Sequence, residues 1–124
     1  MNRILIVSAE PFLRDLVRLS LDDMQAEVRC VKDVAQMHAL CRRVLFDVVI
    51  VLRLSPFLNG SNPVLGLRPT SLRRPLIYVL SWQQSEQMVL SLIECGVDQY
   101  MTFPVSLHRL RKKVSDDLRN ALIG

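Results

Sequence analysis

The sequence predicts an α/β fold in which a parallel sheet carries helices on both faces, because two kinds of segment alternate along the chain. Short runs rich in Val, Ile and Leu, such as 3–7 and 48–52, have the length and β-branching of strands buried on both faces. Between such runs, apolar residues recur every three or four positions, which is typical of helices with one buried side. Right-handed crossover connections then restrict the topology to a few doubly wound forms.

The first part of the chain is expected to form a strand, a helix and a second strand. The strand at 3–7 reads "RILIV", and a helix follows from Pro11 to about Asp23, since Pro suits a first helical turn. The apolar residues of this helix share one helical spacing: Phe12, Leu13, Leu16, Val17, Leu19 and Leu21. Polar and apolar residues alternate in 26–31, which is therefore expected to be a more exposed strand.

The middle of the chain is expected to hold a helix at 34–44, capped by Asp33, and then the central strand at 48–52. The following segment, 54–74, is rich in residues that interrupt helices: Pro56, Gly60, Pro63, Gly66 and Pro69. It is therefore expected to form a third helix of about two turns or fewer, or an irregular loop.

The last part of the chain is expected to add two further strand–helix pairs. A buried strand at 75–80 leads to a helix that Ser85 caps and that ends at Gly96, where a left-handed conformation is needed. A short strand at 98–102 leads to the last helix, which Ser106 caps. One apolar stripe follows this helix: Leu107, Leu110, Val114, Leu118 and Leu122.

Length and composition indicate one folded domain, residues 1–124. Half of the residues are hydrophobic and 23% are charged, which argues against disorder. No apolar run approaches the roughly 20 residues that span a bilayer, and the apolar start of the chain is too short for a signal peptide. The sequence therefore predicts a soluble, cytoplasmic protein without a membrane segment.

The charge and the cysteines exclude some classes of function. The formal net charge is +4, with clusters at 42–43, 73–74 and "HRLRKK", 108–113, which favours an acidic partner. One Trp and two Tyr provide no stacking platform, so nucleic-acid binding is not supported. The three cysteines, Cys30, Cys41 and Cys95, fit neither a disulfide framework nor a zinc pattern and are expected to be reduced core residues.

The carboxyl ends of the strands are the places to search for a site, because ligands of doubly wound sheets bind there. These ends are 8–10, 52–53, 81–82 and 103–104. No Gly-rich phosphate loop follows the first strand and no Walker pattern occurs, which argues against a nucleotide-binding protein. Trp82 is expected either to cover the mouth of a pocket or to belong to a docking surface.

Together these strand ends resemble the receiver domain of bacterial response regulators, over essentially the whole chain. The stretch "ILIVSAEPFLRDLVRLSL" resembles the family's first strand and helix, "FDVVIVLRLSPFLNG" its third strand and turn, and "PLIYVLSW" its fourth strand. The most specific match is "ECGVDQYMTFPVSLHRL", which resembles the segment Gly-Ala-Asp-Asp-Tyr-Leu-Thr-Lys-Pro-Phe. The resemblance implies a flavodoxin-like (βα)5 sandwich with a five-stranded parallel sheet of order 2-1-3-4-5.

The resemblance also implies a chemistry whose main residues are replaced here. In the family, an aspartate at the end of the third strand accepts a phosphoryl group, two acids after the first strand help to hold Mg²⁺, and a lysine contacts the phosphoryl oxygens. In this chain the phosphoacceptor position is Leu52, the acidic pair falls on Ser8 and Ala9 beside Glu10, and the lysine position is Phe103.

Three other family positions keep their residue type. Ser81 supplies the hydroxyl after the fourth strand, and Tyr100 is the aromatic residue that switches orientation in the family. Pro104 follows the lysine position, and the resemblance implies a cis peptide bond before it. We therefore expect a degenerate receiver whose old pocket is closed by Ala9, Leu52 and Phe103, with no cofactor, no metal and no catalysis.

The expected function is a phosphorylation-independent protein–protein interaction module in bacterial two-component signalling or transcriptional regulation. The resemblance implies a partner-binding face on the helix after Ser85, the strand at 98–102 and the last helix. It comprises Gln87, Leu90, Ser91, Glu94, Tyr100, Met101, Arg109, Lys112 and Lys113, with Met88 and Leu92 pointing inward. A homodimer through this face, or an acidic partner on the basic last helix, is a further expectation. The alternatives are a small-ligand-binding or a nucleic-acid-associated module on the same fold.

Overall fold

In the computed structural model, residues 2–53, 75–82, 85–94, 96–102 and 106–123 are described. The strands are β1 (Asn2–Val7), β2 (Ala26–Val31), β3 (Val48–Arg53), β4 (Leu76–Ser81) and β5 (Gln99–Thr102). The helices are α1 (Pro11–Ser20), α2 (Val34–Cys41), α3 (Glu86–Glu94) and α4 (Leu107–Ile123). The third helix expected from the sequence falls in 54–74, which lies outside the described residues.

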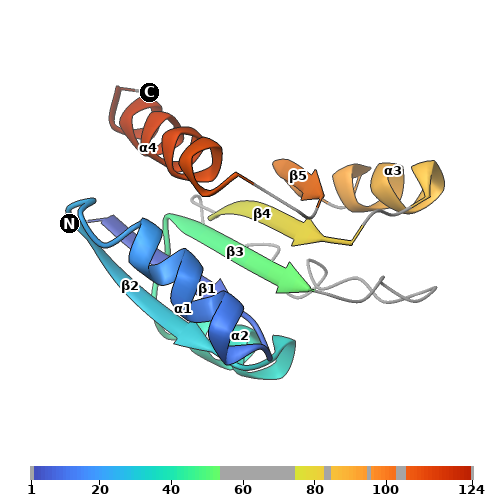
Figure 1. Cartoon of the computed structure of the whole chain (residues 1–124), viewed down its shortest axis with the longest axis horizontal. Coiled ribbons are helices and arrows are strands. Elements are labelled where there is room, and N and C mark those ends of the chain that lie inside the picture. The colour runs from blue at the N-terminus through green and yellow to red at the C-terminus, as the bar shows by residue number, and fades with distance from the viewer. Residues whose placement is uncertain (1, 54–74, 83–84, 95, 103–105, 124) are drawn as a thin grey trace.

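The sheet has the predicted topology. Its five strands are all parallel and follow the order β2-β1-β3-β4-β5, so the fold class inferred from the sequence is confirmed (Figure 1). The register places Val7 beside Val31 of β2 and beside Val51 of β3, so these three strands end side by side. This common edge is where the sequence places its candidate site.

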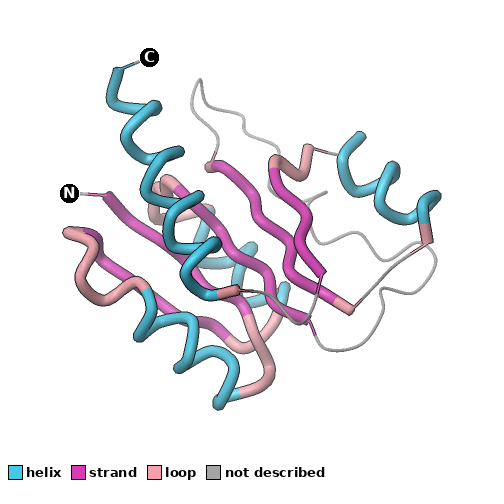
Figure 2. Tube along the Cα trace, turned by 45° about the horizontal axis from the view of Figure 1, so that its top comes forward, coloured by secondary structure: helices cyan, strands magenta, loops and turns pink. Residues whose placement is uncertain are grey.

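Two apolar layers cover the faces of the sheet (Figure 2). On one face, α1 and α4 pack on side chains that include Ile6, Ile50 and Leu80. On the other face, α2 and α3 pack on the intervening residues, such as Val49 and Val79. Because successive side chains of a strand point to opposite faces, strands with continuous apolar runs supply both layers.

The helix N-termini form where short polar residues precede them, as predicted. The Asp33 carboxylate accepts the Gln36 N–H at 2.8 Å, and the Gln36 side chain in turn accepts the Lys32 N–H at 2.9 Å. Such reciprocal bonds satisfy backbone donors that a helix start leaves unpaired. The hydroxyls of Ser85 and Ser106 accept N–H groups of α3 and α4, each at 3.2 Å.

The end of α3 also follows the prediction. Gly96 adopts φ 109°, and its N–H donates to the Ile93 carbonyl at 3.0 Å. The Val97 N–H donates to the Leu92 carbonyl at 3.0 Å. This pair of bonds is the Schellman motif, which needs a left-handed residue after the helix.

Helix α1 differs from the prediction in length and in burial. It ends at Ser20 rather than Asp23, where the Ser20 hydroxyl donates to the Val17 carbonyl at 2.7 Å. Only Leu13, Val17 and Leu21 of the expected apolar face pack into the core, because a single row of a short helix reaches the sheet. The other apolar residues are exposed: Phe12, Leu16 and Leu19.

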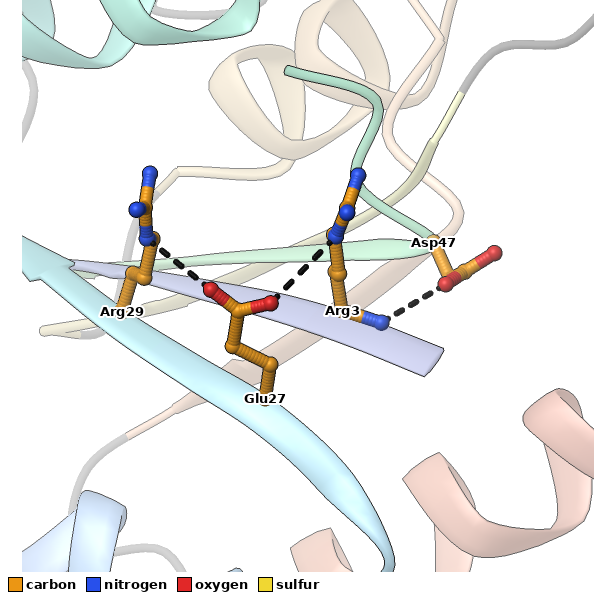
Figure 3. A network of polar contacts seen from close by, with 4 residues as sticks. All are labelled: Arg3, Glu27, Arg29 and Asp47. Atoms are coloured by element: carbon orange, nitrogen blue, oxygen red, sulfur yellow. Dashed lines mark hydrogen bonds and ion pairs between the residues drawn. The ribbon is translucent and has the colours of Figure 1, made fainter. Parts of the chain in front are cut away.

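Two aspartates bond the starts of neighbouring strands together. Asp47, which precedes β3, accepts the Arg3 N–H of β1 at 2.7 Å, and its own N–H donates to the Arg3 carbonyl at 2.8 Å (Figure 3). Asp98, which precedes β5, makes the same pair of bonds with Ile77 of β4, at 2.7 and 2.8 Å. These carboxylates continue the ladder by one residue at the amino edge of the sheet.

Candidate functional site

The carboxyl ends of β1, β2 and β3 enclose a hollow of about 500 Å³, called here the edge hollow. Ten residues line it: Val7, Ser8, Ala9, Glu10, Lys32, Asp33, Val34, Val51, Leu52 and Arg53. They belong to the ends of three adjacent strands and to the turns that lead into α1 and α2. In a doubly wound sheet of this order, the point between β1 and β3 is where ligands are bound.

Leu52 occupies the end of the central strand, as the sequence predicts. It is 5% exposed and packs in the apolar layer beneath α1 and α4. Its neighbour across the sheet is Leu80 of β4. A leucine side chain has no nucleophilic atom, so this position cannot accept a phosphoryl group.

The turn after β1 is held by the Ser8 hydroxyl. Ser8 is 2% exposed, its Oγ accepts the Glu10 N–H at 3.1 Å, and its own N–H donates to the Val31 carbonyl at 3.0 Å. Ala9 and Glu10 are exposed. Ser8 thus shapes the start of α1, and Glu10 is the acidic group that this turn brings to the rim of the edge hollow.

The structure corrects the expectation that apolar residues close this pocket. Val51 and Leu52 form an apolar floor, but Ser8 and Ala9 are too small to fill the space above it. Phe103, which was expected to complete the closure, and Pro104, with its expected cis bond, lie outside the described residues. The hollow therefore remains, with charged groups on its rim.

Sequence reasoning missed three of these charged residues: Lys32, Asp33 and Arg53. Each directly follows a strand, and because β2 is parallel to β1 the ends of the two strands coincide. The signal was available, since the same rule placed Ser8, Ala9 and Leu52 at this edge. Attention to family positions alone left the end of β2 out.

The electrostatics of the edge hollow do not fit Mg²⁺. Two acids and two bases line it, and the Asp33 carboxylate is already engaged as the cap of α2. Mg²⁺ takes oxygen ligands in a near-octahedral arrangement, and the cations Lys32 and Arg53 repel it. In the described part of the chain, no three His, Cys, Asp or Glu side chains gather as a metal site would require.

Ser81 and Tyr100 lie together at the end of β4. Ser81 is fully buried, and its Oγ lies 3.2 Å from the Tyr100 hydroxyl. Both hydroxyls lie within hydrogen-bond distance of the Trp82 carbonyl oxygen, at 3.0 and 3.1 Å. Tyr100 is half-buried and packs against the layer beneath α2 and α3, so its ring is held inward rather than toward solvent.

The expected partner-binding face is present with one correction. The exposed members are Gln87, Leu90, Ser91, Glu94, Arg109 and Lys112, and the half-buried ones are Tyr100 and Lys113. Met101 does not belong to this face, because it is 8% exposed and points into the layer beneath α4. Leu92 is buried and Met88 half-buried, as predicted, and exposed Ile93 is an addition.

The two described cysteines are free thiols on opposite sides of the sheet. Cys30 packs against the layer beneath α1 and α4, and Cys41 against the layer beneath α2. Burial raises the pKa of both thiols, which lowers the population of the reactive thiolate. Cys95 lies outside the described residues.

Similar proteins are response regulators. The chain is 26% identical over 118 residues to the response regulator protein PilR of Pseudomonas aeruginosa and 27% identical over 119 residues to the transcriptional regulatory protein TrcR of Mycobacterium tuberculosis. The matches cover 95% and 96% of this chain but only 26% and 46% of the relatives, so the chain spans less than half of either protein. No family model matches the chain.

The fold comparison agrees. The receiver domain of the Francisella response regulator 1452 superposes with a TM-score of 0.81 over 98% of this chain and 99% of that domain, at 17% identity. The fold and the matches along nearly the whole sequence define the chain as a receiver (CheY-like) domain of the response-regulator class. Among the described residues, no helix has the length and apolar character to cross a bilayer.

Proposed function

We propose that this receiver-type domain works without phosphorylation, as a protein–protein interaction module in signalling or transcriptional control. The observation that carries the proposal is Leu52, an apolar and buried side chain at the end of β3, where the family resemblance requires an aspartate. The replacement of the acid pair by Ser8 and Ala9, and the balanced charges of the edge hollow, remove the metal-binding part of the same chemistry.

The inward position of Tyr100 supports a partner face that needs no activation. The Tyr100 hydroxyl is bonded next to Ser81, the two groups whose movements are coupled to phosphorylation in the family that the sequence resembles. Here both groups bond to the Trp82 carbonyl, so the ring has a preferred position without a phosphoryl group. The domain would present one constant surface to its partner, formed by α3, β5 and α4.

Intact mass spectrometry tests the first half of this proposal. The chain is incubated with Mg²⁺ and a small phosphodonor such as acetyl phosphate, and no stoichiometric adduct is expected. A phosphorylated receiver of known activity, treated in parallel, shows that the donor works. An adduct that hydroxylamine removes would mean that another carboxylate replaces Leu52, and the proposal would be wrong.

Surface variants test the second half. Glu94 and Lys112 are exposed on α3 and α4, so Glu94→Lys and Lys112→Glu are expected to retain the fold and to weaken partner binding at least tenfold. Arg43→Glu, exposed beyond the end of α2, is the matched control. A self-association constant from sedimentation, measured on the same variants, distinguishes a homodimer from a different partner.

A second candidate function is ligand binding, and the volume of the edge hollow favours it. About 500 Å³ with an apolar floor and four charged groups at the rim has the size and lining of a small-molecule site. The matched variants Lys32→Met and Glu10→Gln each remove one charge at this rim. Saturation-transfer NMR against a panel of small acids, amines and zwitterions would support this candidate only if binding is lost in one of the two variants.

A further inference from the structure

Helix α1 exposes a continuous row of three large apolar side chains. Phe12, Leu16 and Leu19 are 78%, 37% and 65% exposed, and they follow one another at spacings of four and three residues. That spacing places them on one side of a helix, next to but separate from the row that packs into the core. Single exposed apolar residues are ordinary, whereas an aligned row marks an interaction surface.

The orientation of α1 shows which way this row faces. The positive charges of Arg14 and Arg18 act on the Cys30 thiol, so these two arginines lie on the flank of α1 that is near the edge strand β2. Leu16 lies about 200° around the helix from each of them, on the opposite flank. This flank is the side of α4, which contacts α1 on the same face of the sheet (Figure 2).

The facing flank of α4 is basic. Arg111, Ser115 and Arg119 follow one another at helical spacing and line a hollow of about 400 Å³ together with 23–26, the residues after α1. Arg111 bonds to the Asp23 carboxylate at 2.5 Å, which fixes this flank beside the end of α1. Along its length α4 carries five cationic and two acidic side chains.

From this arrangement we propose that the groove between α1 and α4 binds an amphipathic helix of a partner protein with acidic residues along one flank. The partner's apolar face would pack on Phe12, Leu16 and Leu19, and its acidic flank would face the row that contains Arg111 and Arg119. Helix-in-groove binding uses anchors at this spacing, and charge complementarity sets the orientation of the bound helix. This surface is separate from the face of α3 and β5, and the inference does not rest on the absence of phosphorylation.

The charges favour this occupant over a second copy of the chain. Two copies that paired through this groove would bring two basic α4 flanks together, in a chain of net charge +4. Three apolar residues per copy also bury less than the roughly 800 Å² per partner that a stable interface uses. A helix that lies along the groove meets both the apolar row and the cations at once.

A selection experiment tests the occupant. A display library of 20-residue peptides, randomised on a helical scaffold, is selected against the full chain, and the enriched peptides are measured by fluorescence anisotropy. We expect net acidic sequences with apolar residues every three or four positions. The double variant Phe12→Ser/Leu19→Ser should weaken their binding at least about tenfold, because exposed anchors carry most of the affinity of such interfaces.

Matched variants separate the apolar from the charged contribution. Leu45→Ser, a loop residue that is 61% exposed, is the apolar control and should change binding less than about twofold. Arg119→Glu should weaken binding more than Arg43→Glu, although both change the net charge equally. Raising the salt concentration should remove the difference between these two variants, since exposed charges are screened.

Three results would overturn the proposal. Enriched peptides that are neutral or basic would exclude an acidic partner, and equal binding to the Phe12→Ser/Leu19→Ser variant would exclude the row on α1. Sedimentation that shows a dimer lost in this variant would assign the row to a second copy. Binding to vesicles with anionic lipids but to no selected peptide would assign it to a membrane surface instead. Circular dichroism of each variant confirms that the fold is retained.

Discussion

One side chain at the end of β3 decides what chemistry the carboxyl edge can perform. Leu52 is 5% exposed and contributes to the layer beneath α1 and α4, so it stabilises the fold in a position where a receiver would spend stability on a charge. Burying an aspartate costs free energy unless metal and lysine partners compensate for it. With Ser8 and Ala9 at the neighbouring positions, the compensation is missing here.

Replacing Leu52 by aspartate is therefore expected to destabilise the domain without restoring phosphorylation. We expect Leu52→Asp to lower the free energy of unfolding by about 2–4 kcal/mol, because it removes a buried apolar side chain and introduces an unpaired charge. Urea unfolding measures the loss, and Leu52→Met is the control that nearly conserves volume and should cost less than about 1.5 kcal/mol. A Leu52→Asp chain that is as stable as Leu52→Met, or that takes up a phosphoryl group from acetyl phosphate, would show that the site still accommodates the anion.

A second buried residue couples the sheet to α4. Tyr78 is fully buried in β4, and its hydroxyl donates to the Asp117 carboxylate, which also pairs with Lys113 at 3.4 Å. Burial, and then the bond to Asp117, raise the pKa of the Tyr78 hydroxyl well above its ordinary value near 10. The folded protein therefore keeps the proton at pH values where the unfolded chain loses it.

The stability of the domain should consequently fall in alkali in a way that depends on Tyr78. Its contribution is fully present below about pH 10, the unfolded pKa, and decreases as the pH rises above it. Tyr78→Phe should cost about 1–3 kcal/mol at neutral pH, since a bond to a charged partner is lost, and should show a smaller further loss above pH 10. Urea midpoints measured from pH 7 to 11 decide this. Parallel pH profiles for the two proteins would exclude Tyr78 as the source.

At the scale of elements, the ends of helices and strands are fixed by a few local residues. Gly96 ends α3 with a left-handed conformation, and the two bonds that close the helix both depend on it. Any residue with a Cβ atom is strained at φ 109°. The turn from α3 into β5 is therefore set by one position.

Gly96→Ala is expected to destabilise the domain by about 1–2 kcal/mol through this strain. The variant should leave the start of α3 unchanged, because the Ser85 cap is at the other end of the helix. Hydrogen exchange should accordingly increase at the end of α3 and the start of β5 before it increases elsewhere. Ser85→Ala, with an expected cost of about 1 kcal/mol at the opposite end, is the matched variant. Stability equal to that of the unmodified chain would mean that the turn relaxes without strain.

The elements show what a sequence can and cannot predict in this protein. Asp33, Ser85, Ser106 and Gly96 act through hydrogen bonds to their nearest neighbours, so their roles follow from local rules and are confirmed. The burial of a helix depends on what covers it, and apolar spacing alone did not distinguish the row of Val17, which is buried, from the row of Phe12, which is exposed.

The same reasoning explains the outcome at the candidate site. The end of β3 could be predicted because a continuous apolar run stops there, and Leu52 lies where it was expected. Whether a pocket closes depends on volumes contributed by several strands, and so the edge hollow and the charges of Lys32 and Arg53 were not foreseen. Met101 was placed on the wrong face because residues on a strand alternate, and its neighbour Tyr100 belongs to the opposite layer.

At the scale of the whole molecule, two apolar layers share one central sheet. The side chains of β1 and β3 contribute alternately to both, so loss of either layer leaves the other face of the same strands without cover. A chain of 124 residues with such a shared sheet should unfold as a single cooperative unit. The two described cysteines offer a way to test this, because Cys30 reports on one layer and Cys41 on the other.

We expect the two thiols to become reactive together. In a Cys95→Ser background at neutral pH, Cys30 and Cys41 should react with iodoacetamide more slowly than a free thiol, because burial raises the pKa of each. Their labelling should rise at the same urea concentration as the loss of circular dichroism, since only global opening would expose both layers. Peptide mass spectrometry after a short pulse gives the two midpoints separately. If Cys41 is labelled at a clearly lower urea concentration than Cys30, then α2 detaches before the sheet unfolds, and the layers are not one cooperative unit.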